Sequence, residues 1–518
     1  MSTRGCVASS HALASGAGLD ILKAGGNAFD AAVATAAALA VVEPMSTGVG
    51  GDMFVLAWST RENGLVALNG SGRSPLQATA ELYRAQGYRS MPDQGILSVT
   101  IPGAVDGWQT LLEKYGRMSL AQVLRPAVAF AREGFPVYEV LGESWQRNAA
   151  KLASCPHSAR TFLRGGRPPE VGDLFRLPEL ADTLEAIGQG GRREFYHGAI
   201  ARSIAECSRR HGGLITGEDL AAHTSTWVEP ISTRYRGYDI YECPPNGQGL
   251  AALLALNLVE GFDLGRLGHN TGEYLHLLIE AMKLAFGDAH AYIADPEHAH
   301  IPVAELLSKA YTEQRRSLIQ PQAAAGTHTG TAGDDTVYLT VVDAERNAVS
   351  FINSLFSPFG SGVTAGDTGI MLQNRGRGFT LEAGHPNCLA PGKRPYHTII
   401  PALIMKDGVP VCSFGVMGGS MQPQGHLQVV CNLVDFGLTP QQALDAQRFR
   451  YFDGRRVALE PLDAGVEGEL ARRGHQLVPH QDSQAAGFGG GQVIVIDHRR
   501  GVLFAGSDPR KDGHAAGY

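Results

Sequence analysis

Apolar residues follow two patterns along the chain, and these predict its main helices and strands. Residues 28–42 (AFDAAVATAAALAVV) are apolar nearly all round and rich in alanine, which predicts a buried helix that packs closely against a sheet and ends at Pro44. Residues 337–343 (VYLTVVD) are rich in β-formers and alternate poorly, which predicts a strand buried on both faces. Residues 271–293 repeat their apolar positions at helical spacing, which predicts a second long helix.

The same patterns extend over the rest of the chain. Helical periodicity marks 120–150, 176–190, 196–212, 249–260, 423–436 and the residues after Thr439. Strand-like runs occupy 53–58, 66–69, a pair within 226–241, the return from Val349, and then 369–373, 399–405, 410–415, 492–496 and 502–505. Blocks of strands separated by blocks of helices indicate a layered architecture rather than repeated βαβ units.

Composition places the chain among ordinary globular proteins with a sizeable core. It has 518 residues, of which 44% are hydrophobic and 18% charged. The net charge of −7, with no basic run, argues against a nucleic-acid partner. The longest apolar run, 31–42, is about half the length of a membrane span. The first residues lack the pattern of a secretory signal, so we expect a cytoplasmic protein with no membrane partner, or a periplasmic or secreted one if a signal was removed.

Cysteines, histidines and glycines give little support for a metal or cofactor. The seven scattered cysteines contain no C-x-x-C pair, which favours free thiols over a disulfide framework or a zinc site. His290, His298 and His300 cluster, but without an i, i+4 pair on one helix, and surface histidines after a helix explain them better. The glycine loop 46–52 lacks the Gly-Lys-Ser/Thr of a phosphate-binding loop. We therefore expect no cofactor and no metal.

One stretch carries a candidate nucleophile. Residues 318–335 have no periodicity and predict a loose tether, which ends where Thr336 opens the buried strand. If the Asp335–Thr336 bond is cut, Thr336 gains an α-amino group that can act as base for its own hydroxyl. The plain alternative is a β-branched residue that starts a strand because it suits one. The chain contains no G-x-S-x-G elbow, so a serine-hydrolase route to acyl transfer has no support.

Several motifs, in order, resemble the gamma-glutamyltranspeptidase (glutathione hydrolase) family of N-terminal-nucleophile hydrolases. They run from GGNAFDAAVATAAALAVVEP near the start to GSDPRKDGHAAGY at the end. The resemblance implies an α+β fold, a four-layer αββα sandwich. It also implies self-cleavage between Asp335 and Thr336 into a large fragment, 1–335, and a small fragment, 336–518, that remain together as one structural unit, a heterodimer.

The resemblance assigns catalytic roles beyond Thr336. Ser354 falls where the family has a threonine that hydrogen-bonds the new α-amino group, and its hydroxyl preserves that role. Gly418 and Gly419, after a predicted strand, resemble the family's oxyanion loop. Two consecutive glycines let backbone N–H groups converge on one point, which a tetrahedral oxyanion requires. The alternative is that these glycines form only a tight turn.

At the substrate-binding positions the sequence departs from the family. The loop 70–75 (GSGRSP) corresponds to the family's R-E-x-A-P, but its arginine, Arg73, is displaced by two residues. The asparagine that follows the family's threonine is Phe356 here. The family's Ser-Ser pair is His397-Thr398. These substitutions predict an acyl pocket built for a different substrate.

Two further changes bear on substrate charge. The family's glutamine and aspartate correspond to Arg375 and Gly378, and that aspartate is expected to pair with the α-ammonium of a γ-glutamyl group. With the acid lost and an arginine gained, the site still suits a carboxylate, bound by Arg375 with help from Arg73. Alternatively, Arg375 is a solvated loop residue or pairs with an acid of the protein. The pattern resembles the branch that includes glutaryl-cephalosporin acylases and oxamate amidohydrolase.

The main hypothesis is an autocleaving amidohydrolase that moves an acidic acyl group from a small amide to Thr336 and then to water, with transfer to an amine also open. One alternative is a true glutathione or γ-glutamyl hydrolase whose ammonium contact comes from another residue. The other is a precursor that never cleaves and serves as a binding protein.

Overall fold

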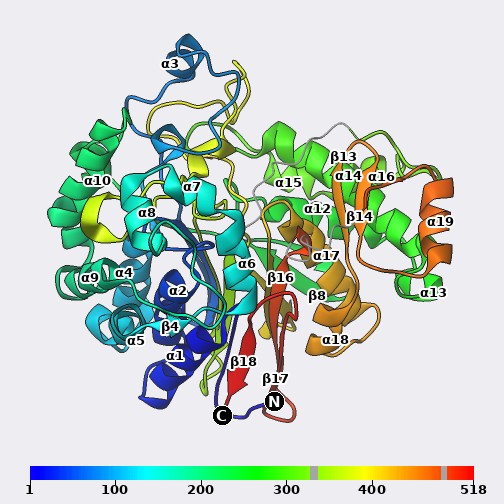
Figure 1. Ribbon diagram of the computed structural model, residues 1–518. Helices are drawn as coiled ribbons and strands as arrows, with labels where there is room; N and C mark the ends of the chain where they lie inside the picture. The colour runs from blue at the N-terminus through cyan, green and yellow to red at the C-terminus, as the bar shows by residue number, and fades with distance from the viewer. Residues whose placement is uncertain (327–335, 480–486) are drawn as a thin grey trace.

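Two antiparallel β-sheets pack face to face at the centre of the molecule, and helices cover both (Figure 1). The computed structural model describes residues 1–326, 336–479 and 487–518. The seven-stranded sheet has the order β18 (His514–Gly517), β1 (Cys6–Ser9), β9 (Val337–Val342), β10 (Ala348–Ser354), β2 (Asp52–Ser59), β3 (Gly64–Gly70) and β6 (Thr226–Val228). The six-stranded sheet has the order β17 (Val502–Ser507), β16 (Gly490–Asp497), β12 (Val409–Met417), β11 (Ala402–Lys406), β8 (Tyr238–Glu242) and β7 (Ile231–Tyr235).

Three hydrophobic clusters separate four layers. The middle cluster lies between the sheets and includes Phe54, Tyr338, Leu403 and Ile494. Outside the seven-stranded sheet lies a cluster with the helices α1 (Ala12–Lys23), α2 (Ala28–Val42), α4 (Ala104–Tyr115), α5 (Leu120–Glu133), α9 (Pro178–His197) and α10 (Ala199–Arg210). Outside the six-stranded sheet lie α12 (Gly249–Val259), α14 (Gly272–Tyr292) and α17 (Met421–Val434). The α+β class and the αββα order of layers are confirmed.

The helix α2 shows why the apolar patterns were informative. Every residue of α2 is buried, as its all-round apolar surface predicts. Asn27 caps its first turn, and the Asp30 side chain accepts the backbone N–H of Asn27 in return (2.9 Å). The strand β9 is likewise buried at every position. Val337 and Leu339 face the helices and Tyr338 faces the second sheet, which explains the missing alternation.

Several predictions for segments with a weaker apolar pattern were wrong in detail. Residues 369–373 form no strand, and Met371 makes only an isolated bridge with Thr364. The helix predicted over 120–150 is interrupted at Gly134, whose positive φ of 104° ends α5. Within 226–241 the predicted pair is present as β7 and β8, but a third strand, β6, precedes it and belongs to the other sheet.

The remaining elements are short. The helices are α3 (Ala80–Ala85), α6 (Glu139–Arg147), α7 (Ala149–Ala153), α8 (Pro156–Phe162), α11 (Gly217–Ala221), α13 (Leu264–Leu267), α15 (Val303–Leu306), α16 (Lys309–Arg316), α18 (Pro440–Asp445) and α19 (Ala464–Arg472). The strands are β4 (Phe135–Pro136), β5 (Leu174–Phe175), β13 (Phe449–Asp453), β14 (Arg456–Leu459) and β15 (Gln476–Leu477). Within the described ranges no helix has the length and apolarity needed to span a bilayer.

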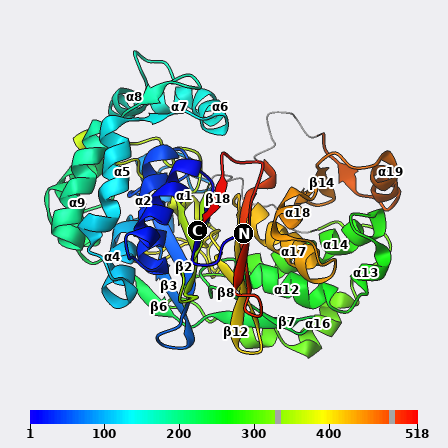
Figure 2. The same ribbon diagram turned by 90° about the horizontal axis from the view of Figure 1, so that it is seen from below.

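Both sheets contain strands from before and from after residue 335. In the larger sheet, β1 lies between β18 and β9, and β10 pairs with β2. In the smaller sheet, β11 pairs with β8. The two chain ends meet at the β1–β18 pair, and Figure 2 shows them side by side. Two fragments separated at residue 335 would therefore share both sheets.

The described part of the predicted tether is anchored rather than loose. The carbonyl of Gln320 bonds to the Nε2 of His276 (2.8 Å), and the N–H of Ala324 donates to Glu280 (3.1 Å). Lys283 donates to the carbonyl of Ala324 (2.8 Å). Three side chains of α14 thus fix 320–324, and the rest of the predicted tether, 327–335, lies outside the described residues.

Candidate active site

Thr336 stands at the start of a row of polar side chains that crosses three strands. In the sheet register Asn353 pairs with Val337 and Ser354 with Asp52, so Thr336, Ser354 and Asp52 are neighbours on adjacent strands. Residues opposite one another in a sheet project to the same face. All three are fully buried, and the hydroxyl oxygens of Thr336 and Ser354 are 3.1 Å apart. The predicted cleavage site also involves Asp335, which lies outside the described residues.

The strand β9, which follows Thr336, packs against β12, which leads to Gly418 and Gly419. Thr340 Oγ1 donates to Ser413 Oγ (2.6 Å), and the Tyr338 ring lies against Gly415. A move of two residues back along β9 therefore corresponds to a move of two residues forward along β12, so the two strands run in opposite directions where they pack. Continued by two more residues, the same pattern would put Thr336 opposite Met417, the residue directly before Gly418.

The loop of Gly418 and Gly419 has a conformation that glycine alone adopts readily. Their φ angles are 121° and 57°, both in the left-handed region. The carbonyl of Gly418 accepts from Met421, and that of Gly419 accepts from Gln248 Nε2 (2.9 Å). Among the described residues, neither glycine N–H donates to a protein acceptor. The carbonyls are therefore held inside the protein while the two N–H groups remain available, as an oxyanion site requires.

Ser354 connects the nucleophile to Arg375. Its hydroxyl accepts from the N–H of Phe356 (2.9 Å) and from Nη2 of Arg375 (3.1 Å). Phe356 also has a positive φ of 81°, which is uncommon for an aromatic residue. The backbone after β10 is thus bent around the Ser354 hydroxyl.

Arg375 is wholly buried and holds its charge close to Thr336. Nη1 donates to Thr398 Oγ1 (2.8 Å), and the guanidinium lies 4.2 Å from the centre of the Phe356 ring. Burial lowers the pKa of Arg375, and the charge of Asp52 opposes that shift. No acid forms an ion pair with Arg375 within the described residues, and its buried Nε has no hydrogen-bond partner there. The alternative of a solvated loop arginine is therefore wrong.

Both ring nitrogens of His397 have hydrogen-bond partners within the protein. Nε2 lies 3.1 Å from Asp52 Oδ2, and the carboxylate can only accept, so Nε2 carries the proton. The N–H of Ile399 donates weakly to Nδ1 (3.4 Å). Burial, and next the charge of Arg375, lower the pKa of His397 to about 4. The ring is therefore neutral at pH 7, and both nitrogens already have partners.

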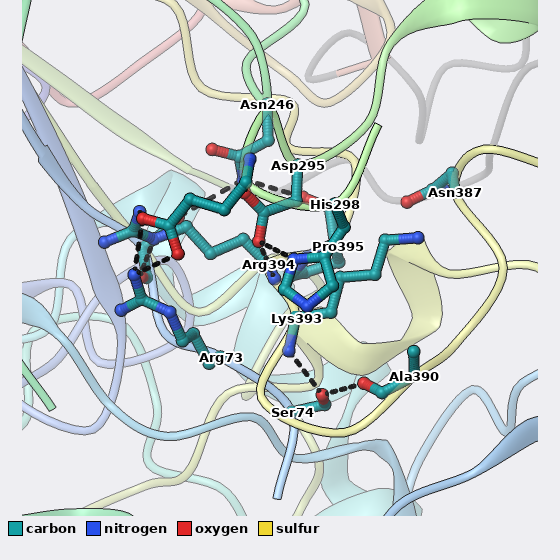
Figure 3. A network of polar contacts seen from close by, with 12 residues as sticks. Arg73, Ser74, Asn246, Asp295, His298, Asn387, Ala390, Lys393, Arg394 and Pro395 are labelled. Atoms are coloured by element: carbon teal, nitrogen blue, oxygen red, sulfur yellow. Dashed lines mark hydrogen bonds and ion pairs between the residues drawn. The ribbon is translucent and has the colours of Figure 1, made fainter. Parts of the chain in front are cut away.

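The side chain of Arg73 makes its contacts with Glu297 and makes none with Thr336 among the described residues. Its Nη2 lies 2.9 Å from both carboxylate oxygens of Glu297, and Arg394 approaches the same carboxylate at 3.4 Å (Figure 3). Arg394 also donates its N–H to Asp295 (2.7 Å), which His298 contacts in turn (3.2 Å). Arg73 thus belongs to a separate charged network.

The histidines weighed as metal ligands are divided among different contacts. His298 contacts Asp295, and the ring of His290 stacks on Tyr396 at 5.2 Å. A different buried group, His276, Glu280 and His475, brings three possible ligand atoms within 4.8 Å of one another. Lys283 already pairs with Glu280 (2.7 Å), and His276 and His475 bond to each other (2.9 Å). These contacts explain the group as part of the anchor for residues 320–324.

Sequence reasoning missed Asp52 and Gln373 as members of the site. Gln373 Nε2 donates to Asp52 Oδ1 (2.9 Å), and both are fully buried. The available signal was the Asp that ends the glycine loop 46–52, since an acid that opens a buried strand needs partners. Two of the partners of Asp52, Gln373 and His397, lie more than 300 residues away along the chain, beyond the reach of local patterns.

Comparison with known proteins gives a consistent result. Residues 14–518 match the family model described as "Gamma-glutamyltranspeptidase". The chain is 42% identical to the glutathione hydrolase-like YwrD proenzyme of Bacillus subtilis (99% of this chain, 98% of that protein). It is 34% identical to the oxamate amidohydrolase proenzyme of Klebsiella pneumoniae (100% and 99%). The crystal structure of cephalosporin acylase from Bacillus halodurans superposes with a TM-score of 0.94 at 46% identity (100% and 96%).

Proposed function

Because the chain belongs to the gamma-glutamyltranspeptidase family, we propose that it is an N-terminal threonine amidohydrolase that acts on amides of small acids. Relatives named as a glutathione hydrolase-like protein, an oxamate amidohydrolase and a cephalosporin acylase support an acyl-transfer reaction on an amide. The pairing of Thr336 with Ser354 on adjacent strands supports the assignment of roles, and so does the loop of Gly418 and Gly419, whose N–H groups donate to no protein acceptor among the described residues.

Maturation is the first step of the proposal. Two of the relatives are named as proenzymes, which supports self-cleavage of this chain. We place the cut between Asp335 and Thr336, where the Thr336 hydroxyl attacks the carbonyl of Asp335. The acyl group moves from nitrogen to oxygen, and water then hydrolyses the ester. The products are the fragments 1–335 and 336–518, which form a heterodimer through their shared sheets.

The catalytic cycle repeats this chemistry on a substrate. The α-amino group of Thr336 accepts the hydroxyl proton while Oγ1 attacks the amide carbonyl. The N–H groups of Gly418 and Gly419 bind the resulting oxyanion. Collapse of this intermediate expels the amine, which takes a proton, and leaves an ester on Thr336. Water, or an amine acceptor, then releases the acyl group and regenerates the hydroxyl.

The buried charge of Arg375 carries the proposal of an acidic acyl group. Its guanidinium is one hydrogen bond from Ser354 and two from Thr336, and no acid forms an ion pair with it among the described residues. A buried charge without an anionic partner is costly, so a site that retains one is suited to an anionic ligand. A carboxylate of the acyl group would supply that anion through two parallel bonds.

A second candidate is true γ-glutamyl hydrolysis, which the 42% identity to a glutathione hydrolase-like protein favours. With Gly378 at the position expected to hold an acid, a γ-glutamyl ammonium would be left unpaired. That costs on the order of 1–3 kcal/mol, or roughly ten- to hundredfold in kcat/KM.

A matched pair of substrates separates the two candidates. Glutaryl-4-nitroanilide and γ-glutamyl-4-nitroanilide differ only in the α-ammonium. We expect the glutaryl amide to have the higher kcat/KM on the mature protein. An equal or higher value for the γ-glutamyl amide would show that another residue binds the ammonium, and the protein would then be a glutathione hydrolase. A protein that stays as one chain and hydrolyses neither would be a binding protein instead.

A further inference from the structure

Asp52 is fully buried beside the site, yet the reaction proposed above does not use it. It begins β2 and lies next to Ser354 in the cross-strand row. Its Oδ1 accepts from the N–H of Gly72 (3.0 Å) and from Gln373 Nε2 (2.9 Å), and its Oδ2 accepts from His397 Nε2 (3.1 Å). One carboxylate thus receives three hydrogen bonds.

The three donors come from three separate segments that meet at this carboxylate. Gly72 belongs to the loop 70–75, Gln373 directly precedes the loop that carries Arg375, and His397 directly precedes Thr398. Arg375 and Thr398 are themselves bonded at 2.8 Å. Asp52 thus holds Gln373, two residues before Arg375, and His397, one residue before Thr398. A shift of Asp52 would therefore displace both Arg375 and Thr398.

The charge of Asp52 also acts on Arg375. Asp52 is the acid whose field acts on the buried Arg375 guanidinium, and it favours the charged form against the cost of burial. Its two carboxylate oxygens are engaged by three donors, and no ion pair joins it to Arg375 among the described residues. It therefore offsets the charge of Arg375 without forming the ion pair that would occupy the guanidinium.

We propose that Asp52 is the positioning residue that fixes the acyl pocket around Arg375, and that it thereby determines the preference for acyl groups bearing a carboxylate. Asp52 acts through Gln373, His397 and the field on Arg375 rather than by contact with the reacting atoms. The assignment rests on the proposed function, since it explains how that acidic specificity is built.

The test compares two substrates that differ only at the end of the acyl chain. Glutaryl-4-nitroanilide ends in a carboxylate and pentanoyl-4-nitroanilide ends in a methyl group. The measured quantity is the ratio of their kcat/KM values on wild-type protein and on Asp52→Asn. Asparagine retains one acceptor for Gly72 and Gln373, but it loses the charge and presents an amide N–H to His397.

We expect Asp52→Asn to lower the glutaryl-to-pentanoyl ratio about tenfold or more, mainly through the KM of the glutaryl substrate. The pentanoyl substrate should change less than about threefold, because it does not use the guanidinium. A ratio that stays the same or rises, or an equal loss on both substrates, would overturn the assignment of Asp52. A wild-type protein without preference for the glutaryl substrate would contradict the proposed function, and the assignment with it.

Two other variants make the result specific. Asp30→Asn removes another buried carboxylate, one that accepts from Asn27 and Arg117 at the start of α2, and it should lower stability without changing the ratio. Gln373→Leu breaks the bond to the Arg375 loop but leaves the charge of Asp52 in place. We expect it to lower the ratio about three- to tenfold. If Asp52→Asn does not fold, an unchanged ratio in Gln373→Leu overturns the proposal.

Discussion

At the scale of single residues, the intact chain already holds the proposed nucleophile in place. The Thr336 and Ser354 hydroxyls are 3.1 Å apart and fully buried before any bond is cut. Arg375 and the N–H of Phe356 both donate to Ser354, so its position is fixed from two sides. The same geometry can therefore serve the cleavage of the chain and later turnover.

Two substitutions at Thr336 should distinguish the contribution of its hydroxyl to cleavage and turnover from that of its methyl group. Thr336→Ala is expected to remain one chain and to be inactive, because it has no nucleophile. Thr336→Ser should cleave and turn over at a reduced rate, since it retains both hydroxyl and amine. Gel electrophoresis over time and kcat/KM on the glutaryl amide measure the two effects. Full cleavage of Thr336→Ala would contradict the assigned nucleophile.

The oxyanion role of Gly419 makes a separate prediction. Its φ of 57° is unfavourable for a β-branched residue, so Gly419→Val should move the N–H away from its present direction. We expect kcat to fall about 100- to 1,000-fold, the usual cost of losing an oxyanion donor. Circular dichroism should show an unchanged fold. If the variant matures and turns over normally, the loop is only a turn.

At the scale of elements, the site is built where regular structure ends. Thr336 precedes β9, Ser354 ends β10, Asp52 begins β2, and Gly418 follows β12. The strands fix these residues relative to one another, while the bent backbone beyond them turns N–H groups toward the site. Arg375 begins a single turn of 3-10 helix, which is why its side chain can return to Ser354.

The turn that carries Arg375 can be tested through its charge. Arg375→Ala should lower kcat/KM for the glutaryl amide strongly, because the carboxylate loses both bonds. Arg375→Lys should restore activity only in part, since an ammonium lacks the planar fork. Steady-state kinetics on the purified heterodimer measures both. Equal activity of the lysine variant and wild type would show that charge alone suffices.

Elements with strong patterns were predictable, and long-range pairing was not. The helices α2, α12 and α14 and the strand β9 follow directly from their apolar periodicity. The four-residue strands β1 and β18 at the chain ends carry no alternation long enough to detect. The pairing of Arg73 with Glu297, 224 residues apart, cannot be seen in either local sequence. The expectation that Arg73 helps at the site depended on such information.

At the scale of the whole molecule, two sheets with strands from both sides of residue 335 form one structural unit. A cut at that point leaves every described strand pair intact. The buried interior also contains histidines that are neutral. Burial lowers the pKa values of His11, His223 and His397 to about 4 each.

These histidines predict how stability depends on pH. An unfolded histidine titrates near pH 6.5, so between about pH 6.5 and 4 the unfolded chain binds protons that the folded protein does not. Stability is full above this window and is lost as the pH falls through it, by about 1.4 kcal/mol per pH unit for each such group. Calorimetry should show a falling Tm. His11→Asn retains an acceptor at the N-cap of α1 and should give a smaller change of Tm with pH. A Tm of the wild-type protein that stays constant between about pH 6.5 and 4 would contradict the prediction.

The most direct test of the account is the N-terminal sequence of the small fragment in purified wild-type protein. Sequencing should give Thr336-Val-Tyr-Leu, and intact mass should show two fragments whose sum exceeds the precursor by one water. This result would show that the cut creates an α-amino group on the threonine that lies beside Ser354. A single uncleaved chain, or a small fragment that begins at any other residue, would contradict the proposed N-terminal threonine mechanism.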